Sequence, residues 1–255
     1  MTERQSNVDR ALAVLSHLAQ HPTGVGVRGI GAALEMSPST VFRLLDALCR
    51  NGFARQDGET GRYVVGMRAV TLGLAALAAV DLTSVAPPYL RALVDETGES
   101  AFLATMDDGE VVYLLKEEGR HAIRTTAVLG TRRPVHCTAL GKTFLAALEP
   151  GEVRTLLQRK GMPAFTAQTV TDPDRLVAEL EQVRRDGFAV DRQEIEDGLM
   201  CLAAPIRDHT GQTVAAISMA GPVGRVLPHA ERYGTRVRAI GHEVSVGLGF
   251  GASGD

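Results

Sequence analysis

The sequence predicts a two-domain α+β chain, in which an N-terminal winged helix-turn-helix is followed by a C-terminal α/β domain with an antiparallel sheet. Within the first 66 residues, three helix patterns precede a short hairpin pattern, the order of a winged helix-turn-helix. Beyond residue 82, hairpin patterns alternate with helix patterns, which favours an antiparallel sheet with helices packed on it. The length of 255 residues allows each domain its own core.

The three N-terminal helices are identified by apolar spacing and by capping residues. The first is expected over Asn7–Leu18 and a shorter second helix around Arg28–Leu34. The third begins after Ser37, a good N-cap, with Pro38 at the first helical position. The pair at 51–52, Asn-Gly, ends it.

The wing and a linker helix follow. Two brief strand patterns, Phe53–Gln56 and Arg62–Val65, flank a polar turn and predict a hairpin. Met67–Ala79 is rich in Ala and Leu and weakly amphipathic, which is typical of a helix covered on several sides by another domain or a partner chain. The expected boundaries are 1–66 for the winged helix, 67–81 for a linker and dimerisation helix, and 82–255 for an effector-binding domain.

The C-terminal region contains both helix and strand patterns. A helical pattern over Leu82–Glu96 is kinked at a Pro-Pro pair at 87–88. The remaining elements are predicted as strands Ser100–Met106, Glu110–Lys116, Met200–Ile206 and Thr213–Ala220, and as helices Thr138–Leu148, Asp172–Asp186 and Pro228–Val246.

Charge and composition set limits on compartment and partners. The net charge is −3, but residues 1–80 carry eight basic and six acidic side chains, whereas the remainder carries nineteen and twenty-four. A mildly basic N-terminal region followed by an acidic remainder fits a DNA-binding domain joined to a separate domain. No apolar run reaches the roughly 18 residues of a membrane span, and no secretory leader is apparent. Three dispersed cysteines predict neither disulfides nor a metal site, so we expect a cytoplasmic protein without cofactor, metal or membrane partner.

The third helix is the candidate for reading double-stranded DNA. In a helix-turn-helix, the N-terminal residues of this helix face base edges and phosphates in the major groove. Hydroxyls and a helix N-terminus suit phosphate oxygens, and arginine can bind either a phosphate or a guanine edge. The alternative is a plain three-helix bundle with a solvated arginine. The candidate DNA-binding residues are Ser37, Ser39, Thr40 and Arg43 on this helix, and Arg55 and Arg62 in the wing.

Three segments resemble the IclR family of bacterial transcriptional regulators. The N-terminal one is IGAALEMSPSTVFRLLDALCRNGFARQDGETGRYVVG. The C-terminal ones are more specific: RRPVHCTALGKTFLAAL (Arg132–Leu148) and DRQEIEDGLMCLAAPIRDHTGQTVAAISMAGP (Asp191–Pro222). The likeness extends from about Asn7 to Gly247.

The resemblance implies a winged helix, a linker helix and a GAF-like effector domain. It further implies homodimers or tetramers on palindromic operators, and effectors that are small carboxylates or aromatic acids from catabolism. We therefore expect a regulator, more specifically a repressor, and no enzymatic activity. The effector-binding residues that the motifs imply are Ala139, Leu140, Asp191, Leu199, Cys201, Ser218 and Ala220, with Thr125 and Arg133 as neighbours.

Several positions depart from the family pattern. Glu35 stands where a turn glycine is frequent, and Gly29 and Gly31 reduce the helix propensity of the second helix. Gln193 replaces the first of a frequent pair of glutamates. Ala220 replaces a hydroxyl that contacts ligand in some members, which implies a less polar pocket.

The segment CTALGKT allows two interpretations. A phosphate-binding loop requires glycine at the position of His136, so this alternative is not supported, and Lys142 is expected on the surface. Because a helix begins at Thr138, the free N–H groups near Ala139 and Leu140 are instead suited to a carboxylate.

Other chemistry-bearing residues also have simpler explanations. Cys137 and Cys201 are candidates for nucleophiles or, together with His136, for metal ligands. Isolated cysteines among apolar residues are, however, usually small core residues. Ser218 lacks the G-x-S-x-G motif of a hydrolase, and Asp191 suits either a strand-end cap or a ligand contact. A transcriptional activator and a cysteine-dependent enzyme on the same scaffold remain as alternatives.

Overall fold

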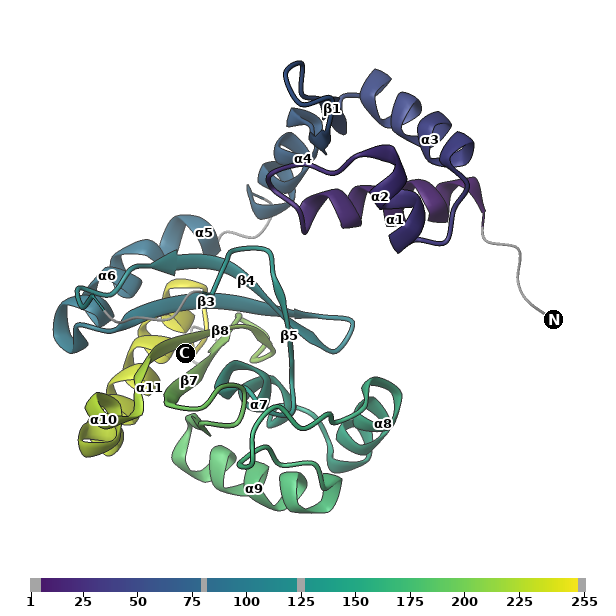
Figure 1. The fold of residues 1–255 in the computed structure, drawn as a ribbon. Helices are drawn as coiled ribbons and strands as arrows, with labels where there is room; N and C mark the ends of the chain where they lie inside the picture. Colours follow the sequence, from purple (N-terminus) through teal and green to yellow (C-terminus); the bar gives the residue numbers. More distant parts are fainter. Residues whose placement is uncertain (1–5, 79–81, 123–126, 252–255) are drawn as a thin grey trace. The chain divides into compact units, whose positions relative to one another are not determined.

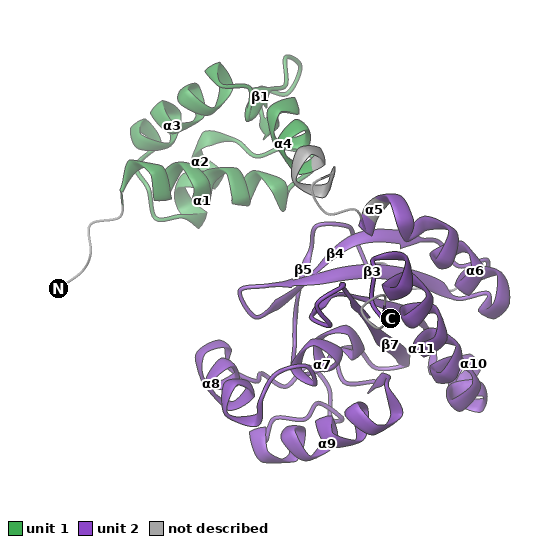
Figure 2. Cartoon of the chain, turned by 180° about the vertical axis from the view of Figure 1, so that it is seen from behind, with its two compact units in different colours: residues 1–80 green, residues 81–255 purple. Residues whose placement is uncertain are grey.

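The computed structural model describes residues 6–78, 82–122 and 127–251. They belong to two compact units, unit 1 (residues 1–80) and unit 2 (residues 81–255), shown in Figures 1 and 2. The predicted fold class is confirmed, because unit 1 carries the three helices and the hairpin and unit 2 carries the antiparallel sheet. Within the described ranges, no helix has the length and apolar character needed to cross a membrane.

Two helices of unit 1 begin at a serine N-cap, and the one at Ser37 was predicted. The Ser6 hydroxyl accepts the N–H of Asp9, whose carboxylate accepts the N–H of Ser6, a capping box. Ser37 caps the third helix, which starts at Pro38. The elements of unit 1 are α1 (Asn7–Ala19), α2 (Val27–Ala33), α3 (Pro38–Arg50), β1 (Ala54–Gln56), β2 (Tyr63–Val65) and α4 (Met67–Ala78).

Two residues that depart from the family pattern, Gly31 and Glu35, are accounted for by the turn between α2 and α3. Glu35 adopts a left-handed conformation with φ 52°, which costs a residue other than glycine about 1–2 kcal/mol. A Cβ on Gly31 would lie 2.8 Å from the carbonyl oxygen of Met36. Gly31 is therefore required by this close approach, despite its low helix propensity.

Unit 2 is a six-stranded antiparallel sheet in the order β5-β4-β3-β8-β7-β6. Its strands are β3 (Ser100–Asp107), β4 (Glu110–Glu117), β5 (Arg132–Pro134), β6 (Ala189–Arg192), β7 (Leu199–Arg207) and β8 (Thr213–Pro222). Its helices are α5 (Leu82–Val85), α6 (Pro87–Thr97), α7 (Ala139–Leu145), α8 (Pro150–Lys160), α9 (Pro173–Asp186), α10 (Val223–Val226), a 3₁₀ turn (Leu227–His229) and α11 (Ala230–Gly247).

Helices cover both faces of this sheet (Figure 1). On one face, α6 and α11 pack against Ile217 and its neighbours in one apolar cluster. On the other face, α7 and α9 pack against Ala203 and Ala216 in a second cluster. The alternation of Ala216 and Ile217 between the two clusters is the period-two pattern of a strand.

The structure corrects several element boundaries. The helix expected over 138–148 ends at Leu145, and α8 begins separately at Pro150, after a capping box between Glu149 and Glu152. The final helix, expected over Pro228–Val246, is a 3₁₀ turn followed by α11, and the short helix α10 before it was not predicted. The short strand β5 was not predicted, because three residues carry too little periodicity.

Two helical glycines of unit 1 provide a matched stability test. Gly31→Ala should lower the free energy of unfolding by about 1–3 kcal/mol because the new methyl group meets the Met36 carbonyl. Gly73→Ala in α4 should raise it by about 0.5–1 kcal/mol, because no atom lies within 4 Å of its Cβ position. Urea unfolding followed by circular dichroism measures both. Equal effects of the two substitutions would contradict the assigned contact.

Candidate functional site

Unit 2 contains a cavity between the sheet and the N-terminal end of α7. Residues from all six strands of the sheet and from α7 line it. Of the residues that the sequence indicated for ligand binding, the cavity brings together Arg133, Ala139, Leu140, Asp191, Leu199, Cys201, Ser218 and Ala220. Thr125 lies outside the described residues.

Strand pairing explains how residues far apart in the chain form one wall. Asp191 on β6 pairs with Cys201 on β7, and Cys201 pairs with Ala220 on β8. Directly paired residues share a face of the sheet, with Cβ atoms about 4.5–5.5 Å apart. Leu199 and Ser218 precede Cys201 and Ala220 by two residues, so they lie on the same face.

The opposite wall is the first turn of α7. Thr138 is the N-cap; its hydroxyl accepts the N–H of Gly141 at 3.1 Å and donates to the carbonyl of Pro134 at 2.8 Å. The N–H groups of Ala139 and Leu140 have no acceptor within the helix. Arg133 on β5 adds a positive charge to the same lining. This end of the cavity therefore offers hydrogen-bond donors.

Asp191 makes the other end an acceptor. Its side chain is fully buried, and its Oδ1 accepts the N–H of Glu194 at 2.7 Å. Its Oδ2 has no hydrogen-bond partner among the described residues. Burial, with a contribution from the nearby Glu194 carboxylate, raises the pKa of Asp191 to about 7.

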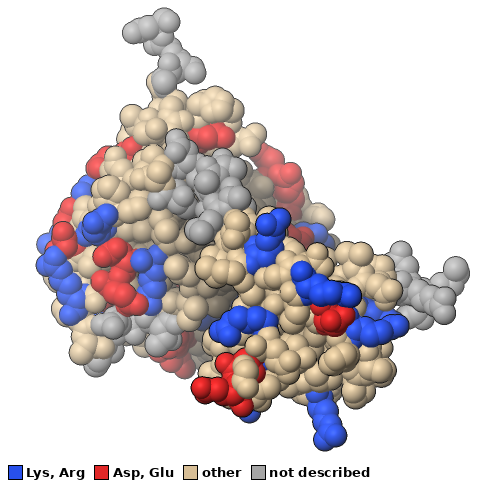
Figure 3. Space-filling model, turned by 90° about the horizontal axis from the view of Figure 1, so that it is seen from above, with Lys and Arg blue, Asp and Glu red and all other residues tan. Residues whose placement is uncertain are grey.

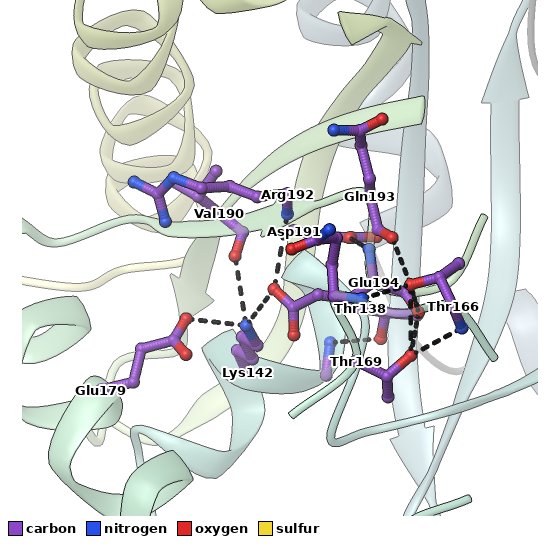
Figure 4. A network of polar contacts seen from close by, with 12 residues as sticks. Thr138, Lys142, Thr166, Thr169, Glu179, Val190, Asp191, Arg192, Gln193 and Glu194 are labelled. Carbon is purple, nitrogen blue, oxygen red and sulfur yellow. Dashed lines mark hydrogen bonds and ion pairs between the residues drawn. The ribbon is translucent and has the colours of Figure 1, made fainter. Parts of the chain in front are cut away.

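Lys142 is not a surface residue, which corrects the expectation from the sequence. Its side chain is 0% exposed, and its Nζ lies 2.5 Å from Glu194 Oε1 and 2.7 Å from Glu179 Oε1 (Figure 4). It also donates to the carbonyl of Val190 at 3.4 Å. The lysine projects inward from α7, and three acceptors compensate for the loss of water around a buried ammonium.

The sequence analysis did not identify every residue of the cavity. The additional lining residues are Phe102, Tyr113, Ala127, Thr138, Ile195 and Glu196. The Phe102 and Tyr113 rings contact each other with centroids 5.3 Å apart. Both lie on strands that were predicted, but the strand pairing that brings them to the cavity has no local sequence signal.

The cysteines of unit 2 are poorly suited to nucleophilic chemistry. Burial raises the pKa of Cys137 to about 12 and raises that of Cys201 well above its ordinary value. Both thiols are therefore protonated at neutral pH, whereas a nucleophile must be a thiolate. Among the described residues, no three His, Cys, Asp or Glu side chains are grouped as for a metal ion.

The candidate DNA-binding residues lie on the open side of α3 and in the wing. Ser37, Ser39 and Arg43 are exposed and Thr40 is half-buried, while Val41, Leu44, Leu45 and Leu48 face the core. The Ser37 hydroxyl lies 3.1 Å from that of Ser39 and 2.9 Å from that of Thr40. Arg55 and Arg62 are exposed in the hairpin, as is Phe42 (57%) on α3, which the sequence analysis did not select.

Basic and acidic side chains are interspersed on the face of the molecule shown in Figure 3.

Two family profiles match the chain. The profile of the IclR helix-turn-helix domain matches residues 7–58, and that of the bacterial transcriptional regulator IclR C-terminal domain matches residues 74–246. The transcriptional repressor AllR of Klebsiella pneumoniae is 32% identical over 251 residues, covering 97% of this chain and 92% of that protein. AllR of Escherichia coli K12 is 34% identical over 248 residues, covering 96% and 91%.

Solved structures of IclR proteins are similar to this chain as well. The IclR protein of Thermotoga maritima has a TM-score of 0.75 at 31% identity and covers 95% of this chain and 98% of its own. An IclR homologue from Microbacterium hydrocarbonoxydans, complexed with 4-hydroxybenzoate, has a TM-score of 0.85 at 27% identity and covers 95% and 99%. With both domains matched and the likeness extending over nearly the whole length, the chain belongs to the IclR family of bacterial transcriptional regulators.

Proposed function

We propose that this regulator is a cytoplasmic repressor that binds a palindromic operator as a homodimer or tetramer, and that a small organic carboxylate in the cavity of unit 2 changes its affinity for DNA. The observation that carries the proposal is the polarity of the cavity, with donors at the α7 end and an acceptor at Asp191. A few directed polar groups in an apolar cleft are the usual composition of a small-molecule site.

The ligand's orientation follows from charge. The N–H groups of Ala139 and Leu140, together with Arg133, favour a carboxylate at their end, whereas an ionised Asp191 repels one. At the other end, between Leu199, Cys201 and Ala220, Asp191 is placed to accept a hydrogen bond from a hydroxyl, and Ser218 is placed to bind a hydroxyl or a keto group. The relative complexed with 4-hydroxybenzoate supports this chemistry, because that ligand carries a carboxylate and a hydroxyl at opposite ends.

Unit 1 supplies the DNA-binding elements of the proposal. A single helix-turn-helix reads one half-site, so a palindromic operator requires two copies. Met67, Val70 and Leu72 on α4 are exposed apolar side chains, which supports a role for this helix in dimerisation. The AllR relatives, which are repressors, favour repression over activation.

The protonation of the two thiols of unit 2 favours ligand binding over catalysis. The cysteine-dependent enzyme considered from the sequence requires a thiolate at Cys137 or Cys201, and the raised pKa of each opposes this. We therefore infer that the cavity holds a ligand without transforming it.

Arg43→Ala should abolish specific operator binding without unfolding unit 1. One good base or phosphate contact is worth about 1–3 kcal/mol, or roughly 5- to 150-fold in affinity. Arg62→Ala should weaken all sequences alike and flatten the salt dependence. Arg50→Ala is the matched control on the same helix, since Arg50 is already paired with Asp46 at 3.1 Å. Fluorescence anisotropy with labelled DNA measures all three, and unchanged affinity of Arg43→Ala would show that the recognition surface lies elsewhere.

The protein should sediment as a dimer or larger at micromolar concentration and protect an inverted repeat in a footprint. Leu72→Asp should shift it toward the monomer, because a charge would be buried in the α4 contact. Val128→Asp in unit 2, where the apolar side chain is also exposed, serves as the control. A wild-type monomer, or a footprint without a repeat, would rule out the symmetric arrangement.

Asp191→Asn and Ser218→Ala should lose the response to ligand while retaining operator affinity, because a ligand acts on DNA binding only through its different affinities for two conformations. Calorimetry on the full chain with 4-hydroxybenzoate, benzoate, lactate, propionate and pyruvate measures binding. Thr155→Ala, on the exposed side of α8, is the control. Tight binding of any of these acids that survives both substitutions would place the site elsewhere.

A further inference from the structure

A fully buried ammonium of unit 2, that of Lys142, lies on α7 two residues beyond Leu140 of the cavity lining. Lys142 is 0% exposed, and its ammonium bridges Glu194, Glu179 and the carbonyl of Val190 (Figure 4). Lys142 does not line the cavity itself. Burying an ammonium is unfavourable unless it is fully hydrogen-bonded. A lysine at this position is therefore expected to have a specific role.

The ammonium fixes the turn that follows β6. Glu194 binds Lys142 through its carboxylate and, through its backbone N–H, donates to Asp191 Oδ1 at 2.7 Å. The preceding residue, Gln193, has φ 64°, a left-handed conformation that a side chain other than glycine adopts only under constraint.

Two hydroxyls hold the same turn from its other side. Thr166 donates to the carbonyl of Gln193 at 2.7 Å, and Thr169 donates to that of Glu194 at 2.6 Å. The turn is thereby held between a buried ammonium and two threonines.

The result of this arrangement is a carboxylate with one oxygen occupied and one free. The backbone N–H of Glu194 holds Asp191 Oδ1, and Oδ2 is buried without a hydrogen-bond partner in the part of the chain that the structure describes, in a residue that lines the cavity. A buried acceptor without a donor is costly, and a ligand donor entering the cavity would remove that cost.

Acidic side chains outnumber basic ones in the cluster around Lys142. Lys142 is one ammonium beside three carboxylates, those of Asp191, Glu194 and Glu179. The charged and titratable groups around Asp191 are Lys142 and Cys137 at α7, Glu179 on α9, Glu194 and Glu196 in the turn, Cys201 on β7, Tyr113 on β4 and Arg133 on β5.

We propose that Lys142 is the positioning residue of the ligand cavity: through Glu194 it holds Asp191 with one oxygen free, and so selects ligands that donate a hydrogen bond over matched ligands that do not. This rests on the proposed function for the choice of ligands, but the placement of Asp191 by Lys142 is a property of the unliganded protein. Lys142 acts through Glu194 and touches no ligand.

The first test compares matched acids on the full chain by calorimetry. The pairs are 4-hydroxybenzoate with benzoate and 4-hydroxybutyrate with butyrate, and the members of each pair differ in a hydroxyl at the end opposite the carboxylate. In the wild type the hydroxyl acid should bind about tenfold tighter or more. In Lys142→Met, an uncharged side chain of similar length, this preference should fall to within about twofold. Lys160→Met, which removes an ion pair with Asp108 (2.8 Å) away from the cavity, should keep it.

The second test needs no ligand. The carboxyl ¹³C signal of Asp191, assigned by its loss in Asp191→Asn, is followed against pH. Lys142 lowers the pKa of Asp191, so Lys142→Met should move the titration upward by about half a unit or more, and Lys160→Met should not. Lys142→Gln keeps a donor to Glu194 without the charge, so it should raise the titration as Lys142→Met does but keep part of the hydroxyl preference; if Lys142→Met does not fold, Lys142→Gln is compared with the wild type on these terms.

The outcomes separate the two claims. A lost hydroxyl preference with an upward titration supports the positioning role. If Lys142→Met weakens both members of each pair equally and the preference survives, Lys142 is merely structural and the proposal is overturned. If no acid binds the wild type, the proposed ligand class is wrong, and hydrogen exchange of the Glu194 amide, which donates to Asp191 Oδ1, decides: faster exchange in Lys142→Met than in Lys160→Met supports the placement of Asp191 by Lys142, and an unchanged rate refutes it.

Discussion

The ligand cavity depends on one buried ion cluster, that of Lys142 with Glu194 and Glu179. Removing an ammonium from water is unfavourable by several kcal/mol, and only close pairing compensates for it. The lysine accordingly binds α7 to α9 and to the turn after β6. Because that same turn holds Asp191, the cluster determines which polar atom the protein presents to a ligand.

The rest of unit 2 provides a frame around this cluster. Helices on both faces of the sheet keep the strands buried, so their side chains toward α7 form a largely apolar wall. Gly141 permits α7 to approach the chain before it, since a Cβ there would lie 2.3 Å from Val135 Cα. The cavity thus has fixed walls, donors at one end and an acceptor at the other, which is a polarity suited to a carboxylate bearing a second polar group.

Much of the fold could be predicted from local sequence. Ser37 and Pro38 mark the start of the recognition helix because capping acts within a single turn, and the wing follows from its turn residues. The cavity residues came from motif resemblance, and strand pairing gives that set a physical basis: Asp191, Cys201 and Ala220 form one row across three strands.

What local sequence could not predict depends on contacts between distant residues. Lys142 was expected on the surface because its partners Glu179 and Glu194 are 37 and 52 residues away. Tyr113 was overlooked because strand register, not periodicity, brings it to the cavity. Glu35 departs from the glycine that its left-handed conformation favours, and only the backbone shows that the turn retains that conformation.

The central claim, that Asp191 is a buried carboxylate without a full set of partners, is tested most directly by the pH dependence of stability. Its folded pKa of about 7 exceeds the ordinary 3.8, so the folded state binds the additional proton, and stability must fall as pH rises from about 4 to about 7. The loss is at most about 4 kcal/mol, from three units at 1.36 kcal/mol each. Urea unfolding of the wild type and Asp191→Asn should show a stability difference in favour of the variant that grows up to pH 7 and is constant above it. A difference that is independent of pH, or that grows as pH falls, would contradict the account.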